Sequence, residues 1–103
     1  MRHLKNIHPG EILKEEFLDP MGISVYFLSK ETGLSQTRLS QIIRGRRSVT
    51  AETAVKLGKF FGVAAEFWMN LQSLYDIEEA QKQYSKEIKS IHRIKALKHA
   101  AAM

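Results

Sequence analysis

Apolar residues recur along the chain at helical spacing, and no segment shows the strict alternation of a β-strand. The pattern predicts a first helix within residues 8–20, with Pro9 in its first turn and Pro20 at its end. Ser24 is the expected N-cap of a second helix. Gly33 should end that helix, because a tight turn there favours a residue that tolerates positive φ.

The remaining segments continue the helical pattern. Ser35 is expected to cap a third helix that ends at Gly45. Thr50 is expected to cap a fourth helix, and Gly62 to end it. Residues 64–91 then predict one long helix or two joined helices. The fold class indicated by the sequence is therefore all-α, with five or six short helices.

The second and third predicted helices form a candidate helix-turn-helix. Their steep crossing needs a small residue at the contact, which Ser29 provides, and a sharp turn, which Gly33 provides. Four apolar residues are placed to hold the pair against the core: Leu28, Leu34, Leu39 and Ile42. Together with the arginines that follow, this spacing predicts DNA binding through the major groove.

The polar face of the third predicted helix carries side chains that can hydrogen-bond to DNA. Gln pairs well with adenine, and Arg pairs well with guanine. The candidate base contacts are Gln36, Thr37, Arg38, Ser40 and Gln41. The candidate phosphate contacts are Arg44, Arg46 and Arg47, with the helix amino ends at Ser24 and Ser35.

The composition agrees with this interpretation. A chain of 103 residues fits one domain, and its formal net charge of +5 favours a polyanionic partner such as nucleic acid. The sequence has no cysteine, which excludes disulfides and thiol catalysis and fits a reducing compartment. No stretch approaches the roughly 20 apolar residues of a membrane span, so we expect a cytoplasmic protein without membrane contact.

No group of residues predicts catalysis, a cofactor or a metal site. The chain shows neither a nucleophile-elbow motif nor a glycine-rich phosphate loop. Its histidines do not form a metal-ligand spacing with nearby carboxylates: His3, His8, His92 and His99. We therefore expect a protein that is not an enzyme and binds neither metal nor cofactor.

Large apolar side chains crowd residues 64–75, and the stripe consists of Phe67, Trp68, Leu71, Leu74 and Tyr75. They can pack in the core under Phe60 and Phe61, or part of the stripe can form a two-fold dimer interface. The two interpretations are compatible, with Asn70 and Gln72 expected at the polar edge of the surface. A homodimer would place two recognition helices about 34 Å apart over an inverted repeat in DNA.

The segment from residue 76 to residue 103 has six basic and four acidic residues, a net charge of +2. Apolar residues recur in it at helical spacing: Ile77, Tyr84, Ile88, Ile91 and Ile94. The pattern predicts an amphipathic helix. Such a helix can be a solvated terminal element, bind a partner protein, extend the dimer or contact the DNA backbone.

Three segments resemble the HigA-type antitoxins, also known as relatives of virulence-associated protein I, in the lambda-repressor-like (XRE) class. They are "HPGEIL", the spacing in "TAETAVKLGKFFG", and the "EFWMNLQ" that follows. The resemblance covers roughly residues 7–79. It implies that residues 1–79 form a lambda-repressor-like domain of five helices. This domain would contain the helix-turn-helix and a dimerisation helix. Residues 80–103 would form a C-terminal helical extension.

The resemblance also implies a function. Such antitoxins form homodimers, bind an operator with an inverted repeat, repress their own operon, and neutralise a toxin similar to RelE-type mRNA interferases. In this class the start of the recognition helix contacts bases, which here means Gln36 and Thr37, with Ser40 deeper in the groove. Many relatives have Gln at the start of the preceding helix, where this sequence has Val25. The alternative is a stand-alone regulator, similar to a phage repressor, that has no toxin partner.

The resemblance leaves the toxin-binding surface open. A toxin that binds ribosomes should be basic, so the acidic first helix is a better electrostatic match for it than the basic tail. The acidic residues of that helix are Glu11, Glu15, Glu16 and Asp19. The same residues also fit an ordinary exposed helix face.

Overall fold

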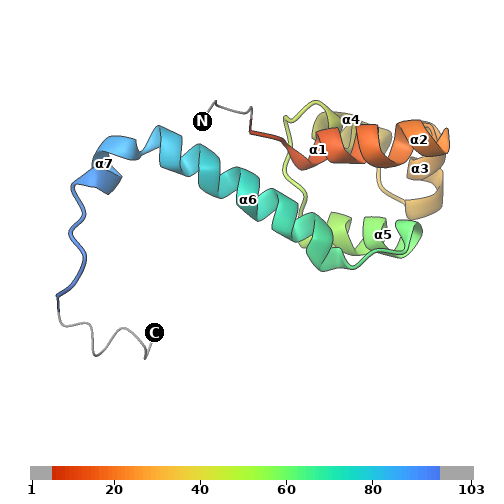
Figure 1. Cartoon of the computed structure of the whole chain (residues 1–103). Coiled ribbons are helices and arrows are strands. Elements are labelled where there is room, and N and C mark those ends of the chain that lie inside the picture. The colour runs from red at the N-terminus through yellow and green to blue at the C-terminus, as the bar shows by residue number, and fades with distance from the viewer. Residues whose placement is uncertain (1–5, 96–103) are drawn as a thin grey trace.

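The computed structural model of this protein describes residues 6–95, and every secondary-structure element in that range is a helix. The helices in chain order are α1 (Pro9–Ile12), η1 (Leu13–Leu18), α2 (Asp19–Met21), α3 (Val25–Thr32), α4 (Gln36–Ile43), α5 (Ala51–Phe61), α6 (Ala65–Gln83) and α7 (Ser85–Lys89). The first three are continuous and form one N-terminal rod (Figure 1). The prediction of an all-α fold is confirmed.

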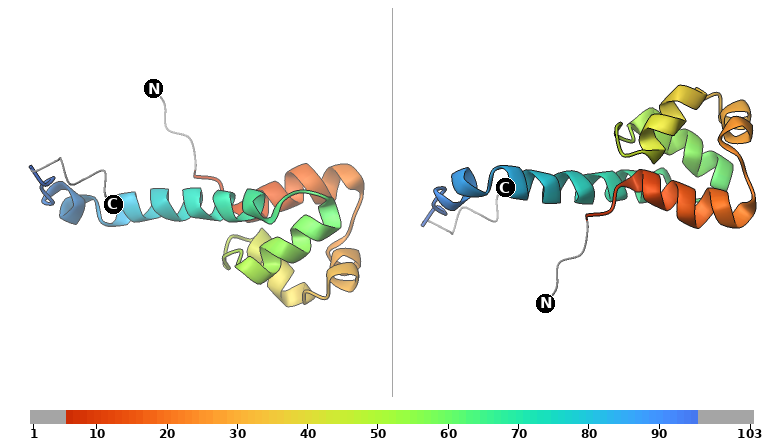
Figure 2. Two further views of the ribbon diagram at one scale, coloured as in Figure 1. Left: turned by 90° about the horizontal axis from the view of Figure 1, so that it is seen from below. Right: turned by 90° about the horizontal axis from the view of Figure 1, so that it is seen from above.

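The helices gather at one end of α6 (Figures 1 and 2). α6 packs mainly against α5 and also touches α1, whereas its second half projects beyond the bundle and leads to α7. The molecule is elongated as a result, with extents of 54 × 32 × 24 Å. None of the described helices is long and apolar enough to cross a membrane.

The N-terminal rod does not end at Pro20, contrary to the sequence prediction. It continues to Met21 and ends at Gly22, which adopts a left-handed conformation with φ of 65°. The middle of the rod, η1, is a π-helix, and the Asp19 N–H donates to the carbonyl of Lys14, five residues back. This wider turn directly precedes Pro20, and it gives room to a ring that would collide with a regular helical turn.

The predicted helix caps are confirmed. The hydroxyls of Ser24, Ser35 and Thr50 each accept a hydrogen bond from the backbone N–H three residues further on. Gly33 and Gly62 end α3 and α5 in left-handed conformations, with φ of 78° and 75°. The boundaries of these helices therefore follow from local capping residues and glycines, independently of the packing between helices.

One core unites the bundle. It buries all four residues predicted to hold the helix-turn-helix in place: Leu28, Leu34, Leu39 and Ile42. Trp68 is fully buried, and its ring centroid lies 5.1 Å from that of Phe17 in the N-terminal rod. Trp68 therefore belongs to the core of the protomer and has no surface to offer the dimer interface for which it was a candidate.

Gly10 brings the N-terminal rod into direct contact with α4. A Cβ atom on Gly10 would lie 1.8 Å from the carbonyl oxygen of Ile42, so a larger residue does not fit. The rod is thus held against the end of α4 by a backbone-to-backbone approach. This contact fixes the direction in which α4 presents its outer face.

The C-terminal part differs from the sequence prediction in its detail. α6 runs without a break through residue 79, the expected domain boundary. Tyr84 separates it from α7, so of the two alternatives left open by the sequence the structure has two joined helices. The predicted amphipathic helix does not continue, since residues 90–95 lie outside any helix. All five apolar residues of that pattern are exposed: Ile77, Tyr84, Ile88, Ile91 and Ile94. His3, His99 and the end of the predicted tail lie outside the described residues.

Candidate nucleic-acid interface

The turn between α3 and α4 is organised by the side chain of Thr32. Its hydroxyl donates to the carbonyl of Leu28 at 2.7 Å and accepts a hydrogen bond from the Leu34 N–H at 3.2 Å. Gly33 between them supplies the positive φ. This role of Thr32 was not predicted from the sequence, although a threonine directly before a turn glycine is a recognisable signal for such bonding.

The outer side of α4 forms a shallow polar hollow of about 280 Å³. Its lining consists of Gln36, Thr37, Ser40, Gln41 and Arg44. These residues share one face because successive helix positions are 100° apart, so that positions i, i+1, i+4, i+5 and i+8 fall together. The structure thus brings five of the predicted DNA contacts onto one surface, which we call the contact face.

Arg38 lies elsewhere. Two positions after Gln36 it is rotated by about 200° around α4, and its side chain is 27% exposed. Its Nη1 lies 3.2 Å from Oε1 of Glu52 in α5. A base contact by Arg38 would require this ion pair to break. The partner Glu52 was not among the predicted site residues.

The loop after α4 carries the remaining arginines beside the contact face. Arg46 and Arg47 are both exposed, and Nη1 of Arg47 donates to Oε1 of Gln41 at 3.2 Å. Further along the loop, the Val49 N–H donates to Oε1 of Gln72 at 2.7 Å. Gln72 is only 4% exposed, so the prediction that it lies at a polar edge was wrong.

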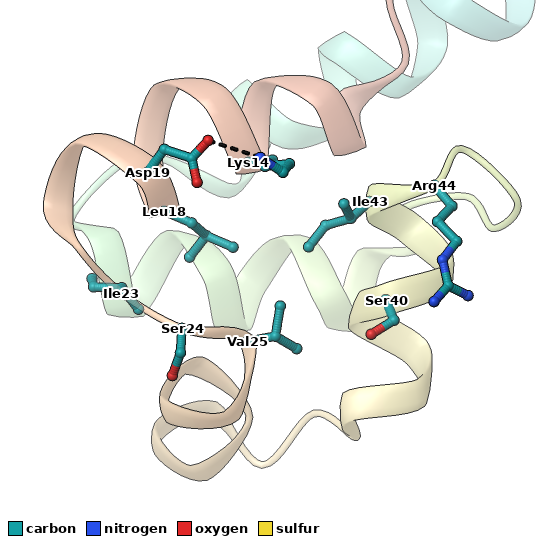
Figure 3. A pocket seen from close by; sticks show the side chains of 9 residues that line it. All are labelled: Lys14, Leu18, Asp19, Ile23, Ser24, Val25, Ser40, Ile43 and Arg44. Atoms are coloured by element: carbon teal, nitrogen blue, oxygen red, sulfur yellow. Dashed lines mark hydrogen bonds and ion pairs between the residues drawn. The ribbon is translucent and has the colours of Figure 1, made fainter.

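A second depression of about 330 Å³ lies between the N-terminal rod, α3 and α4 (Figure 3). Lys14 stands on one side, where its ammonium forms an ion pair of 2.9 Å with Asp19 that raises the pKa of Lys14. Ser24 marks the amino end of α3, and Arg44 extends along the opposite wall (Figure 3). Asp19 lines the same hollow and neutralises Lys14, so Arg44 and the amino end of α3 are the groups that favour an anionic phosphate here. Val25 contributes an apolar wall to this hollow and packs against the core, so it adds no polar contact at the start of α3.

The candidate dimer residues are split between core and surface. Leu74 is 66% exposed and Phe67 is 39% exposed, while Leu71 is half-buried. Tyr75 is half-buried because its ring packs edge-on against His8, with centroids 4.8 Å apart. Three of the candidate dimer residues therefore face outward on α6, and we call Phe67, Leu71 and Leu74 the α6 stripe.

His8 has a structural role at the start of the N-terminal rod. Its Nδ1 accepts a hydrogen bond of 2.9 Å from the Gly10 N–H, which caps α1. Burial lowers the pKa of His8, and the carboxylates of Asp76 and Glu11 partly oppose this effect. Among the described residues, no group of three or more His, Asp or Glu side chains could hold a metal ion.

Residues 13–68 match the family model described as helix-turn-helix. Virulence-associated protein I of Dichelobacter nodosus is 46% identical over 76 residues, which are 74% of this chain and 70% of that protein. Antitoxin HigA-1 of Vibrio cholerae is 38% identical over 82 residues, 80% of this chain and 77% of that protein. This chain belongs to the HigA-type antitoxin family.

A solved structure agrees with the assignment to the HigA-type family. The antitoxin HigA of Pseudomonas aeruginosa, determined with the higBA promoter, is 38% identical and superposes with a TM-score of 0.84. The similarity covers 87% of this chain and 99% of that chain. The resemblance and the lambda-repressor-like fold inferred from sequence are confirmed. As a HigA-type protein, this chain is a DNA-binding transcription regulator and not an enzyme.

Proposed function

We propose that two copies of this HigA-type protein bind an inverted repeat upstream of their own gene and repress transcription. The observation that carries the proposal is the contact face, which gathers five hydrogen-bonding side chains on one side of α4. α4 is amphipathic, with Leu39 and Ile42 fully buried on its other side. A helix held in this way can enter the major groove without disturbing the core.

In this proposal, base contacts and phosphate contacts are divided between two sets of residues. Gln36, Thr37, Ser40 and Gln41 face the base edges from the contact face. Arg44, Arg46 and Arg47 neutralise phosphates at the groove wall, together with the amino ends at Ser24 and Ser35. The hydroxyls of Ser24 and Ser35 already accept one first-turn N–H each, so an anion would bind the other N–H groups of the first turn, which have no partner within the helix.

The two-fold contact is proposed on the outward stripe of α6. Phe67, Leu71 and Leu74 recur three and four positions apart, as a helix-to-helix contact requires. We expect Leu74→Glu to convert the dimer to monomers in sedimentation experiments and to weaken operator binding. Ile88→Glu in α7 is the matched control, because Ile88 is also exposed but lies outside the stripe. An unchanged dimer in Leu74→Glu would contradict this interface.

The antitoxin role is the second half of the proposal: the protein also binds and neutralises a RelE-like toxin. Membership of the HigA-type family supports it. Glu15 and Glu16 on the N-terminal rod are exposed and offer a basic partner an electrostatic match. Glu15 lines a hollow together with Arg44 of the contact face, so a toxin on this surface would lie next to the DNA-binding residues.

The decisive experiment has two arms. The protein is titrated against its own upstream DNA and against a scrambled duplex, and preference for the upstream DNA by at least about 10³-fold is expected. It is also co-expressed with the adjacent small open reading frame. A stable complex, together with growth arrest when the neighbour is expressed alone, supports the antitoxin role. Operator preference without complex or toxicity would favour the stand-alone regulator instead.

A further inference from the structure

The carboxylate of Glu52 joins two cations beside the start of the recognition helix. Oε1 of Glu52 lies 3.2 Å from Nη1 of Arg38, and Oε2 lies 2.8 Å from Nζ of Lys56. Glu52 itself occupies the first turn of α5, where a negative charge is favoured by the helix dipole. The position of Glu52 in α5 and its ion pair with Lys56, four residues further on, thus hold the carboxylate in place. Arg38 contacts it from α4.

Arg38 is placed where a free arginine would reach DNA. It is the third residue of α4, and its backbone N–H donates to the capping hydroxyl of Ser35 at 3.0 Å. In the proposed complex this is the end of α4 that enters the groove, between two phosphate backbones. A cation there adds a contact to any sequence, because phosphates are present at every site.

We propose that Glu52 is a specificity-determining residue that withholds Arg38 from DNA phosphates and thereby suppresses binding to non-operator DNA. This inference rests on the proposed function, since it concerns the operator-binding surface itself. While Glu52 is in place, the three side chains of the cluster carry a net charge of +1 instead of +2. The cluster then releases fewer counterions from DNA than its two cations could.

The effect is larger on random DNA than on the operator for a geometrical reason. At the operator, base contacts from the contact face fix the orientation of α4, and Arg38 lies about 200° around the helix from Gln36. On random DNA no base contact fixes that orientation, so the protein can tilt to bring any free cation onto a phosphate. Freeing Arg38 therefore increases affinity most for DNA that lacks the operator sequence.

The test compares Glu52→Gln with Glu66→Gln. Both substitutions remove one exposed carboxylate from the first turn of a helix, α5 or α6, so the dipole effect and the change in net charge are matched. Fluorescence anisotropy gives the affinity of each protein for operator and scrambled duplexes over a range of KCl concentrations. Circular dichroism melts confirm that each variant is folded.

We expect Glu52→Gln to tighten binding to the scrambled duplex roughly two- to fivefold, the range of one exposed ion pair. The slope of log K against log[salt] should become steeper by about 0.9, the value for one further phosphate contact. Operator affinity should change less than twofold, so the ratio of operator to scrambled affinity falls. Glu66→Gln should leave this ratio unchanged.

Two Arg38 variants identify the cation. Arg38→Gln alone should leave the salt slope on scrambled DNA unchanged, because a withheld arginine makes no contact to lose. Arg38→Gln combined with Glu52→Gln should remove the gain of the Glu52 variant. Equal effects of Glu52→Gln and Glu66→Gln, or a smaller slope in Arg38→Gln alone, would overturn the proposal. Failure of the unmodified protein to prefer its operator would instead refute the proposed function.

Discussion

Gln72 and Val49 join the long helix α6 to the loop that follows the recognition helix. The buried Gln72 Oε1 accepts a hydrogen bond of 2.7 Å from the Val49 N–H, and Gln72 Nε2 donates to Asp76 Oδ1 at 2.9 Å. Val49 ends the loop that carries Arg46 and Arg47. The amide of Gln72 therefore fixes the far end of the arginine loop from inside the protomer.

We expect Gln72→Leu to lower the free energy of unfolding by about 1–3 kcal/mol, because the Val49 N–H loses its partner in a buried position. Chemical denaturation measures the difference. Gln83→Leu at the exposed end of α6 serves as control and should change stability little. A Gln72→Leu protein as stable as the control would show that the loop does not depend on this bond.

Sequence patterns were sufficient where the cause was local. The caps at Ser24 and Ser35 and the turn at Gly33 follow from short polar and glycine signals that act within a few residues. Apolar spacing likewise predicted the core positions of α3 and α4. The helix-turn-helix and its contact face could therefore be located from sequence alone.

Sequence patterns were insufficient where contacts join distant segments. Gln72 has a polar side chain of the kind usually found at the surface, and its burial depends on a hydrogen bond from a loop N–H 23 positions away. The Arg38–Glu52 pair spans 14 positions and two helices. Trp68 fitted both a core and an interface, and the choice depended on the position of Phe17 across the bundle. Such contacts depend on the angles at which the helices pack, and these angles cannot be predicted from the periodicity of apolar residues.

Gly10 is expected to be irreplaceable in the N-terminal rod. A Cβ atom at this position would lie 1.8 Å from the Ile42 carbonyl oxygen, which is backbone and cannot rotate away. We expect Gly10→Ala to lower the melting temperature, with a cost of about 1–3 kcal/mol or more from overpacking. Glu15→Ala, at an exposed position of the same rod, is the control. If both variants melt like the unmodified protein, the rod and α4 are not in this close contact.

His8 should make stability depend on pH. Burial holds the pKa of His8 below its ordinary value of 6.5, and the neutral Nδ1 is needed to accept the Gly10 N–H. The unfolded chain therefore binds a proton more readily than the folded one. The contribution of neutral His8 to the free energy of unfolding is complete above about pH 6.5. It is lost as the pH falls from there through the folded-state pKa of His8.

Thermal melts between about pH 8 and pH 5 test this dependence. His8→Asn keeps an oxygen that can cap α1 but does not titrate in this range, so its stability should fall less as the pH is lowered. The opposing carboxylates, Asp76 and Glu11, stay in place in both proteins. Parallel pH profiles for the two proteins would exclude His8 as the cause.

The division between base and phosphate contacts predicts different losses for two exposed residues. Gln36→Ala removes a side chain of the contact face, so operator affinity should fall by about 1–3 kcal/mol while scrambled DNA is bound as before. Arg46→Ala removes a loop cation, so both affinities should fall and the salt slope should decrease by about 0.9. Lys82→Ala is the control for net charge: it also removes one cation, but from the last turn of α6, on the part of that helix that projects beyond the bundle (Figure 1). Loss of sequence discrimination in Arg46→Ala, with none in Gln36→Ala, would mean that the loop and not the contact face recognises the operator.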